Sequence, residues 1–226
     1  MSDIPATGPG LQVVLASRNA GKAREFARLL GPEIQVEALP AVVTLPEETG
    51  VTFAENAELK ARAVFAELGG AAAVLADDSG LEVDGLGGRP GVRSARYAGE
   101  TAGDRDNVAL LLRELDEVEE RGAQFVCELV MLIPSARDTS SPSGGEALMV
   151  RVRGVLRGVI EREPRGTRGF GYDPVFRPCG WHVTLAEASG VDKDRVSHRG
   201  SAARTLLARV RELGVLQQGE PRRAGE

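Results

Sequence analysis

Two adjacent carboxylates, Asp77 and Asp78, follow directly after an apolar run at residues 71–76. The run predicts a buried strand, and the Ser-Gly pair after the two acids predicts that the strand opens into a loop there. Neighbouring acids repel each other unless a cation lies beside them, so the pair indicates a divalent-metal or general-base site. An Asx-type turn, in which the carboxylates cap only backbone amides, explains these residues equally well. The glycine-rich segment at residues 85–91 favours the site, because surface loops rarely need so bare a backbone.

A second polar junction lies near the N-terminus, between an apolar run at residues 11–16 and a helical pattern. The first turn of a helix offers unpaired N–H groups and the positive end of the helix dipole, and Lys22 lies in that turn, so the junction indicates an anion site. It is not a Walker loop, because Ala16 stands where that motif requires glycine. Simple capping of the helix by Ser17 and Asn19 is the alternative.

Another helix is predicted to begin after Thr52, because Thr52 and Glu55 form the pattern of a capping box. Asn56 and Lys60 are four residues apart at the border of its apolar stripe, so both side chains can reach toward a cleft. Glu48 lies in the loop just before the capped end. Each of these three residues, taken alone, also fits an ordinary solvated position.

Two features near the C-terminus could contact a ligand. Phe170 lies between two glycines, so a loop can present its ring beside a bare backbone, which suits the stacking of a flat ring. A buried anchor for the loop is the alternative. Ser197 predicts the N-cap of a final helix whose first turn holds His198 and Arg199. Cations there oppose the helix dipole, which indicates a ligand contact unless the two residues lie on the surface by chance.

The elements that must position these residues alternate along the chain. Apolar periodicity predicts strands at 11–16, 71–76, 124–133 and 149–160, and helices at 20–30, 53–68, 104–120 and from 197 onward. A Ser/Pro/Gly-rich segment at residues 135–145 is expected to join the last two strands as a hairpin loop. We expect disordered ends at residues 1–10 and 216–226 around a single domain at residues 11–215.

Composition and charge exclude several classes of protein. The 226 residues are 42% hydrophobic and 27% charged, as in soluble globular proteins. The formal net charge of -5 argues against binding to nucleic-acid polymers or anionic membranes. No signal pattern is present, and no apolar run approaches the roughly 20 residues of a membrane span. Cys127 and Cys179 show no metal-like or disulfide spacing, so a cytoplasmic protein is expected.

Five segments, taken in order, resemble the Ham1 family: SRNAGKAREF, EETGVTFAENAELKA, LADDSGLEVDGLGGRPGVRSARYAGE, GFGYDP and SHRGSA. Each is moderately specific, and the five together are highly specific over residues 13–213. The family comprises the inosine triphosphate pyrophosphatases, also called non-canonical purine NTP or dITP/XTP pyrophosphatases. The resemblance implies an elongated α/β fold, with a long mixed sheet flanked by helices and a nucleotide cleft between two lobes, in a cytoplasmic homodimer.

The resemblance also implies an activity and its residues. ITP, dITP and XTP would be hydrolysed to the monophosphate and pyrophosphate with Mg²⁺, which keeps deaminated purines out of DNA and RNA. Asp78 resembles the family's proton acceptor and a metal ligand, Glu48 resembles the second metal carboxylate, and Lys60 resembles a catalytic phosphate contact. The substrate-binding positions are Ser17, Arg18, Asn19, Ala20, Gly21, Lys22, Asn56 and Ser79 on the phosphate side, and Phe170, Gly171, Tyr172, Asp173, Lys193, His198 and Arg199 on the base side.

Two other functions stay open from the sequence. A Maf-like nucleotide pyrophosphatase would act on dTTP, UTP or modified nucleotides, but the complete SHR and FGYD segments argue against it. A nucleotide sensor without turnover is disfavoured because Glu48, Lys60 and Asp78 are all present. The chain departs from the usual family residues at Ser17-Arg18 and at residues 181–183, and the second departure leaves open the shape of the loop before Lys193.

Overall fold

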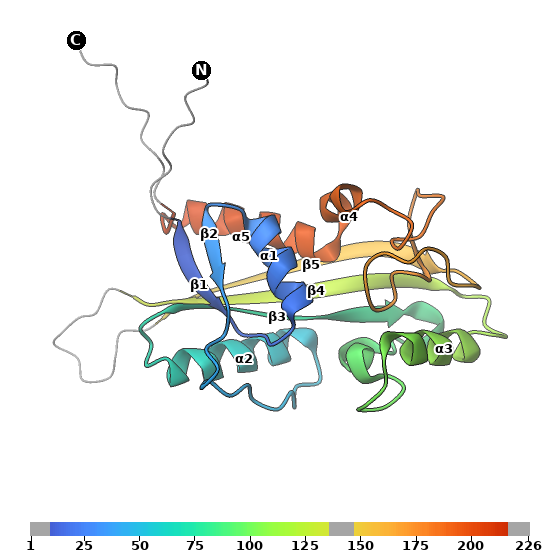
Figure 1. Ribbon diagram of the computed structural model, residues 1–226, viewed down its shortest axis with the longest axis horizontal. Coiled ribbons are helices and arrows are strands. Elements are labelled where there is room, and N and C mark those ends of the chain that lie inside the picture. The colour runs from blue at the N-terminus through green and yellow to red at the C-terminus, as the bar shows by residue number, and fades with distance from the viewer. Residues whose placement is uncertain (1–9, 136–146, 217–226) are drawn as a thin grey trace, which may run out of the picture.

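The computed structural model describes residues 10–135 and 147–216 (Figure 1). Most of the expected tails, residues 1–10 and 216–226, and of the expected hairpin loop at 135–145 therefore lies outside the described residues. Leu216 is described, and it is buried in the core. Cys127 is buried, Cys179 is exposed, and both are free. Within the described ranges, the helices are too short or too polar to cross a membrane.

A six-stranded mixed sheet runs along the length of the molecule in the order β2-β1-β3-β4-β5-β6. Its strands are β1 (Leu11–Leu15), β2 (Ile34–Glu37), β3 (Ala73–Val83), β4 (Gly122–Ile133), β5 (Leu148–Ile160) and β6 (Phe176–Pro178). β1, β2 and β3 are parallel, whereas β3 to β6 pair antiparallel. The long central strands give the molecule its elongated shape (Figure 1), and the expected α/β fold with a long mixed sheet is confirmed.

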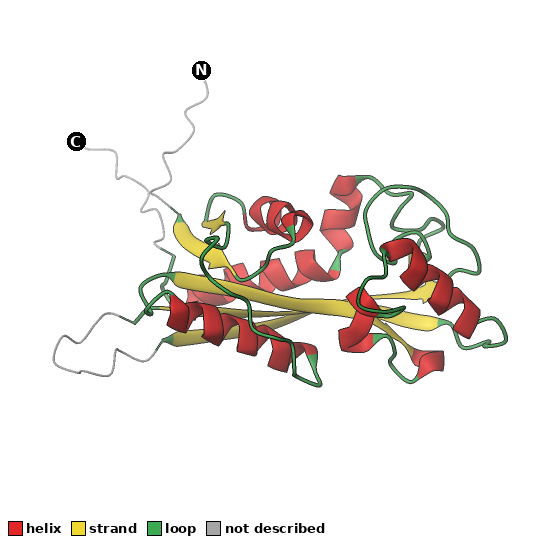
Figure 2. Cartoon of the chain, turned by 60° about the horizontal axis from the view of Figure 1, so that its bottom comes forward, coloured by secondary structure: helices red, strands yellow, loops and turns green. Residues whose placement is uncertain are grey.

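Helices cover both faces of the sheet (Figure 1). On one face lie α1 (Ala20–Leu30), α4 (Gly190–Val196) and α5 (His198–Glu212); on the other lie α2 (Phe53–Glu67) and α3 (Asp104–Glu114). The turned view in Figure 2 shows α2 and α3 lying one after the other along the long strands. Two short 3₁₀ helices, Asp84–Leu86 and Gly91–Arg96, connect β3 to the segment before α3. The sequence patterns did not predict these short helices, β2, β6 or α4.

Local signals fix where two of the helices begin. The Thr52 hydroxyl accepts a hydrogen bond from the Glu55 N–H (3.2 Å), and the Glu55 carboxylate accepts one from the Thr52 N–H (3.1 Å). This reciprocal pair is the predicted capping box of α2. The Ser197 hydroxyl accepts a hydrogen bond from the Gly200 N–H (2.9 Å), which confirms the predicted cap of α5.

The predicted helix at 104–120 is shorter in the structure, because α3 ends at Glu114. Leu115 is buried, as its place in the apolar pattern predicts, but it already lies outside the helix. The Arg121 guanidinium donates a hydrogen bond to the Leu115 carbonyl (2.7 Å), so an arginine just before β4 satisfies a carbonyl at the C-terminal end of α3. This contact is not visible in the apolar pattern.

β3 does not end at Asp77 and Asp78, contrary to the prediction, because β4 pairs with it to its last residue. Gly80 does not form a turn there. A Cβ atom at Gly80 would lie 2.8 Å from the Gly91 carbonyl oxygen and would collide with the Ser94 hydroxyl. Glycine is thus needed where the 3₁₀ helix after β3 crosses close to the strand. The two acids lie within a continuous strand.

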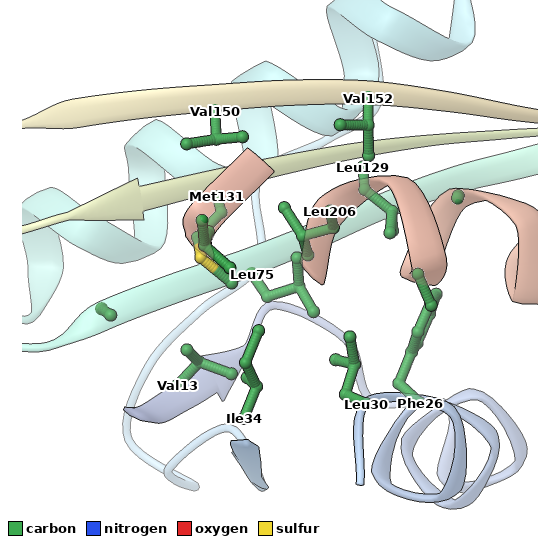
Figure 3. Close-up of a cluster of buried hydrophobic side chains, with 14 of the residues drawn as sticks. Val13, Phe26, Leu30, Ile34, Leu75, Leu129, Met131, Val150, Val152 and Leu206 are labelled. Atoms are coloured by element: carbon green, nitrogen blue, oxygen red, sulfur yellow. The ribbon is translucent and has the colours of Figure 1, made fainter. Parts of the chain in front are cut away.

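The apolar core lies on both faces of the sheet. Figure 3 shows the cluster between the sheet and helices α1 and α5, in which Leu75 and Leu129 pack with Phe26 and Leu206. On the opposite face, α2 covers a second cluster that includes Val74. A third cluster lies toward the α3 end of the molecule. Val74 and Leu75 are neighbours in β3. Because side chains alternate along a strand, β3 contributes apolar side chains to the clusters on both faces of the sheet.

Candidate active site

Asp77 and Asp78 lie where two neighbouring strands separate. β1 accompanies β3 as far as Ala16, whose N–H donates to the Leu75 carbonyl (2.8 Å). After this bond the chain turns away through residues 17–19 into α1. Because side chains alternate along a strand, the two acids point to opposite faces of β3, and each has its own set of partners.

The first set, here called the Asp78 group, consists of Glu48, Asn56, Lys60 and Asp78. Lys60 Nζ lies 2.6 Å from Glu48 Oε1 and 3.2 Å from Asp78 Oδ1. Asn56 Nδ2 donates to Asp78 Oδ2 at 3.3 Å, and Asn56 Oδ1 accepts from the Gly50 N–H at 2.7 Å. Asn56, Lys60 and Asp78 are all buried. Helix α2 therefore presents an ammonium and an amide to the same carboxylate, and the two side chains lie on one side of the helix, as their four-residue spacing predicts.

The charges within the Asp78 group are strongly coupled. Burial raises the pKa of Asp78, although the ammonium of Lys60 opposes this shift. Burial would lower the pKa of Lys60, but attraction by Asp78, Asp77 and Glu48 raises it above its ordinary value. Burial likewise opposes ionisation of Glu48, but Lys60 holds the pKa of this carboxyl below its usual range. Lys60 is therefore charged at neutral pH and keeps Glu48 ionised.

The donor set of the Asp78 group fits Mg²⁺. Glu48 and Asp78 each direct one carboxylate oxygen at the same Lys60 ammonium, so the two acids converge on a position that already attracts a cation. No cluster of three metal-ligating side chains occurs in the described parts of the chain. Two carboxylates supplemented by water and phosphate oxygens are the usual protein share of a magnesium site beside a nucleotide.

A cavity of about 290 Å³ opens beside Glu48 and Lys60. The 3₁₀ helix after β3 contributes Arg96, whose guanidinium lies 3.5 Å from Glu48 Oε2. The remaining lining residues are Leu45, Pro46, Glu47 and Glu100. The cavity is therefore polar, and it connects the Asp78 group to solvent on the side of the loop before α2.

The second set, here called the Asp77 group, consists of Lys22, Glu25, Asp77, Ser79 and Arg199. Lys22 Nζ lies 3.0 Å from Asp77 Oδ2, which also accepts the Ser79 hydroxyl at 3.0 Å. Arg199 donates to the Ser79 hydroxyl at 2.8 Å and to Glu25 Oε2 at 3.1 Å. Asp77 is fully buried, which opposes its ionisation, but Lys22 and Arg199 hold its pKa far below the usual range. Asp77 is thus a fixed negative charge that orients two cations.

The Asp77 group contains buried polar atoms that lack partners. Asp77 Oδ1 and Glu25 Oε1 have no hydrogen-bond partner within residues 10–135 and 147–216. Buried polar atoms are normally satisfied, so unpaired ones indicate a place for ordered water or a ligand.

The N-terminus of α1 is built as predicted. Asn19 Oδ1 accepts the Lys22 N–H (3.1 Å), and Ser17 Oγ accepts the Asn19 N–H (3.2 Å). Ala20 and Gly21 form the start of the helix, so no bulky side chain precedes Lys22. The side chain of Arg18, by contrast, donates to backbone carbonyls in the loop after β2. Capping by Ser17 and Asn19 and an anion site at the same turn are therefore compatible.

Phe170 lies between two cations. Lys193 Nζ is 4.9 Å and Arg199 Cζ is 5.2 Å from the centre of its ring, and the side chain is 38% exposed. Asp173 holds this arrangement, because it accepts the Phe170 N–H (2.9 Å) and pairs with Lys193. Gly169 has a φ of +78°, and a Cβ atom there would collide with Asp173. The loop therefore needs this glycine to present Phe170.

Four of the predicted base-side residues are buried, namely Tyr172, Asp173, His198 and Arg199. The His198 ring stacks on Phe125, with ring centres 4.8 Å apart, and its Nδ1 has no hydrogen-bond partner in the described residues. Burial, together with Arg199 and Lys193, lowers the pKa of His198 far below its usual value. The Tyr172 hydroxyl donates to the Ser94 carbonyl (2.9 Å), so this ring anchors the loop in the core.

A chain of contacts across β3 links the phosphate-side and base-side residues. Lys60 contacts Asp78, and the next residue of β3, Ser79, accepts a hydrogen bond from Arg199. Arg199 in turn lies over Phe170. The remaining predicted residue on this loop, Gly171, donates its N–H to Asp104 at the start of α3 (2.7 Å). Residues separated by more than 100 positions in the sequence are therefore brought to the same stretch of β3.

Sequence reasoning missed three contributors. Glu25 follows Lys22 by three residues on α1, so their shared face was a usable signal. Asp77 was recognised as an acid without a separate role, although strand alternation places it opposite Asp78. Arg96 lies in the motif SARYAGE, but no local pattern indicates that it reaches Glu48.

Comparisons with known proteins agree with this geometry. A sequence model of the Ham1 family matches residues 13–209. A dITP/XTP pyrophosphatase of Bacillus licheniformis is 46% identical over 87% of this chain and 96% of the relative. A dITP/XTP pyrophosphatase of Frankia alni is 47% identical over 90% of this chain and 98% of the relative.

Solved structures of similar proteins share the fold. The Ham1 protein of Staphylococcus aureus matches with a TM-score of 0.77 and 38% identity, covering 89% of this chain and 99% of that protein. A nucleoside-triphosphatase or dITP/XTP pyrophosphatase of Mycobacterium abscessus matches with a TM-score of 0.66 and 41% identity. The match covers 87% of this chain and 99% of that protein. The similarity therefore includes nearly the whole length of these proteins.

Proposed function

This chain belongs to the Ham1 family, and from that membership and its site we infer that it hydrolyses non-canonical purine nucleoside triphosphates. The substrates are ITP, dITP and XTP, and the products are the nucleoside monophosphate and pyrophosphate. The observation that carries this function is the convergence of Glu48, Lys60 and Asp78 beside the α1 N-terminus. None of the relatives described above is a Maf-like enzyme.

Neutralisation of charge is the first task of such a site. A nucleoside triphosphate carries about four negative charges, which repel an attacking water. Lys22 and the free N–H groups of α1 lie on one side of β3, and Lys60 lies on the other. In our proposal these groups hold the triphosphate, and Mg²⁺ bound by Glu48 and Asp78 supplies further positive charge at the phosphate oxygens.

Attack at the α-phosphorus requires a base that can take a proton from water. We assign this task to Asp78, because burial gives its carboxylate a raised pKa and therefore greater basicity. Asn56 and Lys60 each contact one of its oxygens and fix its orientation. Pyrophosphate is then the leaving group, and Lys22 and Lys60 would offset its negative charge.

Selectivity is proposed to arise at Phe170 and Arg199. The purine would stack on the exposed ring of Phe170, and Arg199 would donate to the 6-keto oxygen that hypoxanthine and xanthine carry. Adenine presents an amino donor at this position, so ATP would leave donors unpaired in the site. We further propose that this hydrolysis cleanses the nucleotide pool. The protein would act in the cytoplasm as a homodimer.

The test is a pyrophosphate-release assay with ITP, dITP, XTP, GTP, ATP and dTTP, each with Mg²⁺ and with EDTA. The proposal predicts release from the first three in Mg²⁺ and little from ATP or dTTP. Preferential release from dTTP would favour the Maf-like alternative, and tight binding without release would favour the sensor. Light scattering during gel filtration tests the homodimer independently of turnover.

A further inference from the structure

Arg18 reaches across from the β1–α1 turn to another segment of the chain. Its Nη1 donates to the Leu39 carbonyl (2.7 Å), and its Nη2 donates to the carbonyls of Pro40 (2.8 Å) and Val43 (2.6 Å). The Ala41 carbonyl lies 3.3 Å from the same nitrogen. A guanidinium is a planar fork with five donors, so it can satisfy several carbonyls at once, which a lysine cannot do in the same geometry.

The segment that Arg18 holds carries the metal-binding acid. Residues 38–52 contain no helix or strand, and Glu48 lies within them. Helix α2 supplies further anchors: the Thr44 N–H donates to the carboxylate of Glu67, the Gly50 N–H donates to Asn56, and Lys60 pairs with Glu48. Arg96 also pairs with Glu48. Arg18 is the anchor that comes from the β1–α1 turn.

Arg18 lies within the turn that leads into α1. Ser17 and Asn19, on either side of it, form the turn that caps α1 and sets the direction of Lys22. The backbone of residue 18 thus belongs to the anion site of α1, whereas its side chain belongs to the loop of Glu48. A triphosphate that contacts α1 and also shares a metal with Glu48 requires these two parts at a fixed separation.

We propose that Arg18 is a positioning residue that ties loop 38–52 to the α1 turn and so sets the distance between Glu48 and the phosphate-binding N-terminus of α1. The inference rests on the function proposed above. It replaces the direct phosphate contact that the family resemblance implies for Arg18, because the guanidinium is already committed to carbonyl oxygens.

Hydrogen exchange tests the tie without substrate or metal. The wild type, Arg18→Gln, Arg18→Lys and the control Arg24→Gln are compared, Arg24 being an exposed residue of α1. Leu39 and Val43 are also buried in the cluster under α2, so the variants are expected to fold. Amides of residues 43–50 should exchange about tenfold faster in Arg18→Gln, as expected for a loss of about 1.4 kcal/mol. The exchange rates of these amides in Arg18→Lys should lie between those in the wild type and in Arg18→Gln. The rates in Arg24→Gln should equal those in the wild type.

Binding of Mn²⁺, followed by electron paramagnetic resonance without nucleotide, tests the consequence at Glu48. The proposal predicts about tenfold weaker Mn²⁺ binding in Arg18→Gln, no change in Arg24→Gln, and a higher KM for ITP. Unchanged exchange and unchanged Mn²⁺ binding with a raised KM would establish a direct phosphate contact and overturn the proposal. Unchanged values in all three measurements would also overturn it. If the wild type failed to hydrolyse ITP, only the proposed function would fail, because exchange and Mn²⁺ binding do not require turnover.

Discussion

Lys60 Nζ on α2 lies 3.2 Å from Asp78 Oδ1 on β3, and both side chains are buried. The pair joins a helix to the central strand at the point where β1 turns away. A buried ammonium and carboxylate lose hydration, and this loss is offset only when each keeps good partners. Asn56 and Glu48 provide those partners, so the pair is a buried, fully partnered ion pair rather than a simple surface one.

Asp78→Asn should remove turnover while the fold persists. The amide keeps the shape of the side chain but cannot accept a proton from water, so kcat for ITP should fall by about 10²–10⁴. The unfolding transition by circular dichroism should remain cooperative, since Lys60 keeps Glu48 as a partner. Normal turnover in a folded Asp78→Asn variant would contradict the role of Asp78 as the base.

Lys60→Met should lower stability as well as activity. It leaves Asp78 and Glu48 without their shared cation, and loss of one partner from a buried pair costs about 3–5 kcal/mol. Urea unfolding of Lys60→Met and of the double variant Lys60→Met/Asp78→Asn measures this coupling. The double variant should be more stable than Lys60→Met alone, because it no longer buries an unpaired carboxylate. Strictly additive losses would show that the two side chains do not interact.

Phe170→Leu should weaken the binding of purine nucleotides. Stacking of a base on an aromatic ring contributes about 1–3 kcal/mol, so KM for ITP should rise by at least about fivefold. Phe170→Tyr keeps the ring and serves as the matched control, with KM close to that of the wild type. Equal KM values in Phe170→Leu and the wild type would exclude stacking on this ring.

His198 should make the fold less stable in acid. Burial, with Arg199 and Lys193, lowers the pKa of His198 in the folded state, whereas the unfolded chain takes up this proton near pH 6.5. The unfolded state therefore binds more protons below that pH, and the free energy of unfolding falls as the pH decreases. His198 should contribute up to about 1.4 kcal/mol per pH unit to this fall.

The two histidines of the chain allow a matched comparison for this effect. Urea unfolding between pH 7.5 and 5.0 should show a shallower pH dependence in His198→Gln than in the wild type. The exposed His182 is the control, and His182→Gln should retain the wild-type slope. Identical slopes in all three proteins would show that His198 is not held neutral by the fold.

Local parts of the fold and the site were predictable from the sequence. The turn at Ser17 and Asn19 and the capping box at Thr52 and Glu55 depend on contacts within four residues, and the structure has both. The spacing of Asn56 and Lys60 likewise placed both on one side of α2, and in the structure both contact Asp78. In each case the predicted feature depends only on residues close together in the chain.

Distant contacts explain what the sequence did not reveal. The Ser-Gly pair after Asp78 resembles a turn, but Gly80 is required because Ser94 and Gly91 cross close to the strand. The ion pair of Glu25 with Arg199 joins residues 174 positions apart, and no local pattern indicates it. The family resemblance implied a phosphate contact for Arg18, whereas its side chain extends to carbonyls more than 20 residues away.

The most direct test of the active site is hydrolysis of ITP in ¹⁸O-labelled water with Mg²⁺, with mass analysis of both products. Attack at the α-phosphorus by water activated at Asp78 predicts one ¹⁸O atom in IMP and none in pyrophosphate, and no turnover in Asp78→Asn. Label in the pyrophosphate, release of inorganic phosphate with IDP, or undiminished turnover in Asp78→Asn would contradict the proposed site.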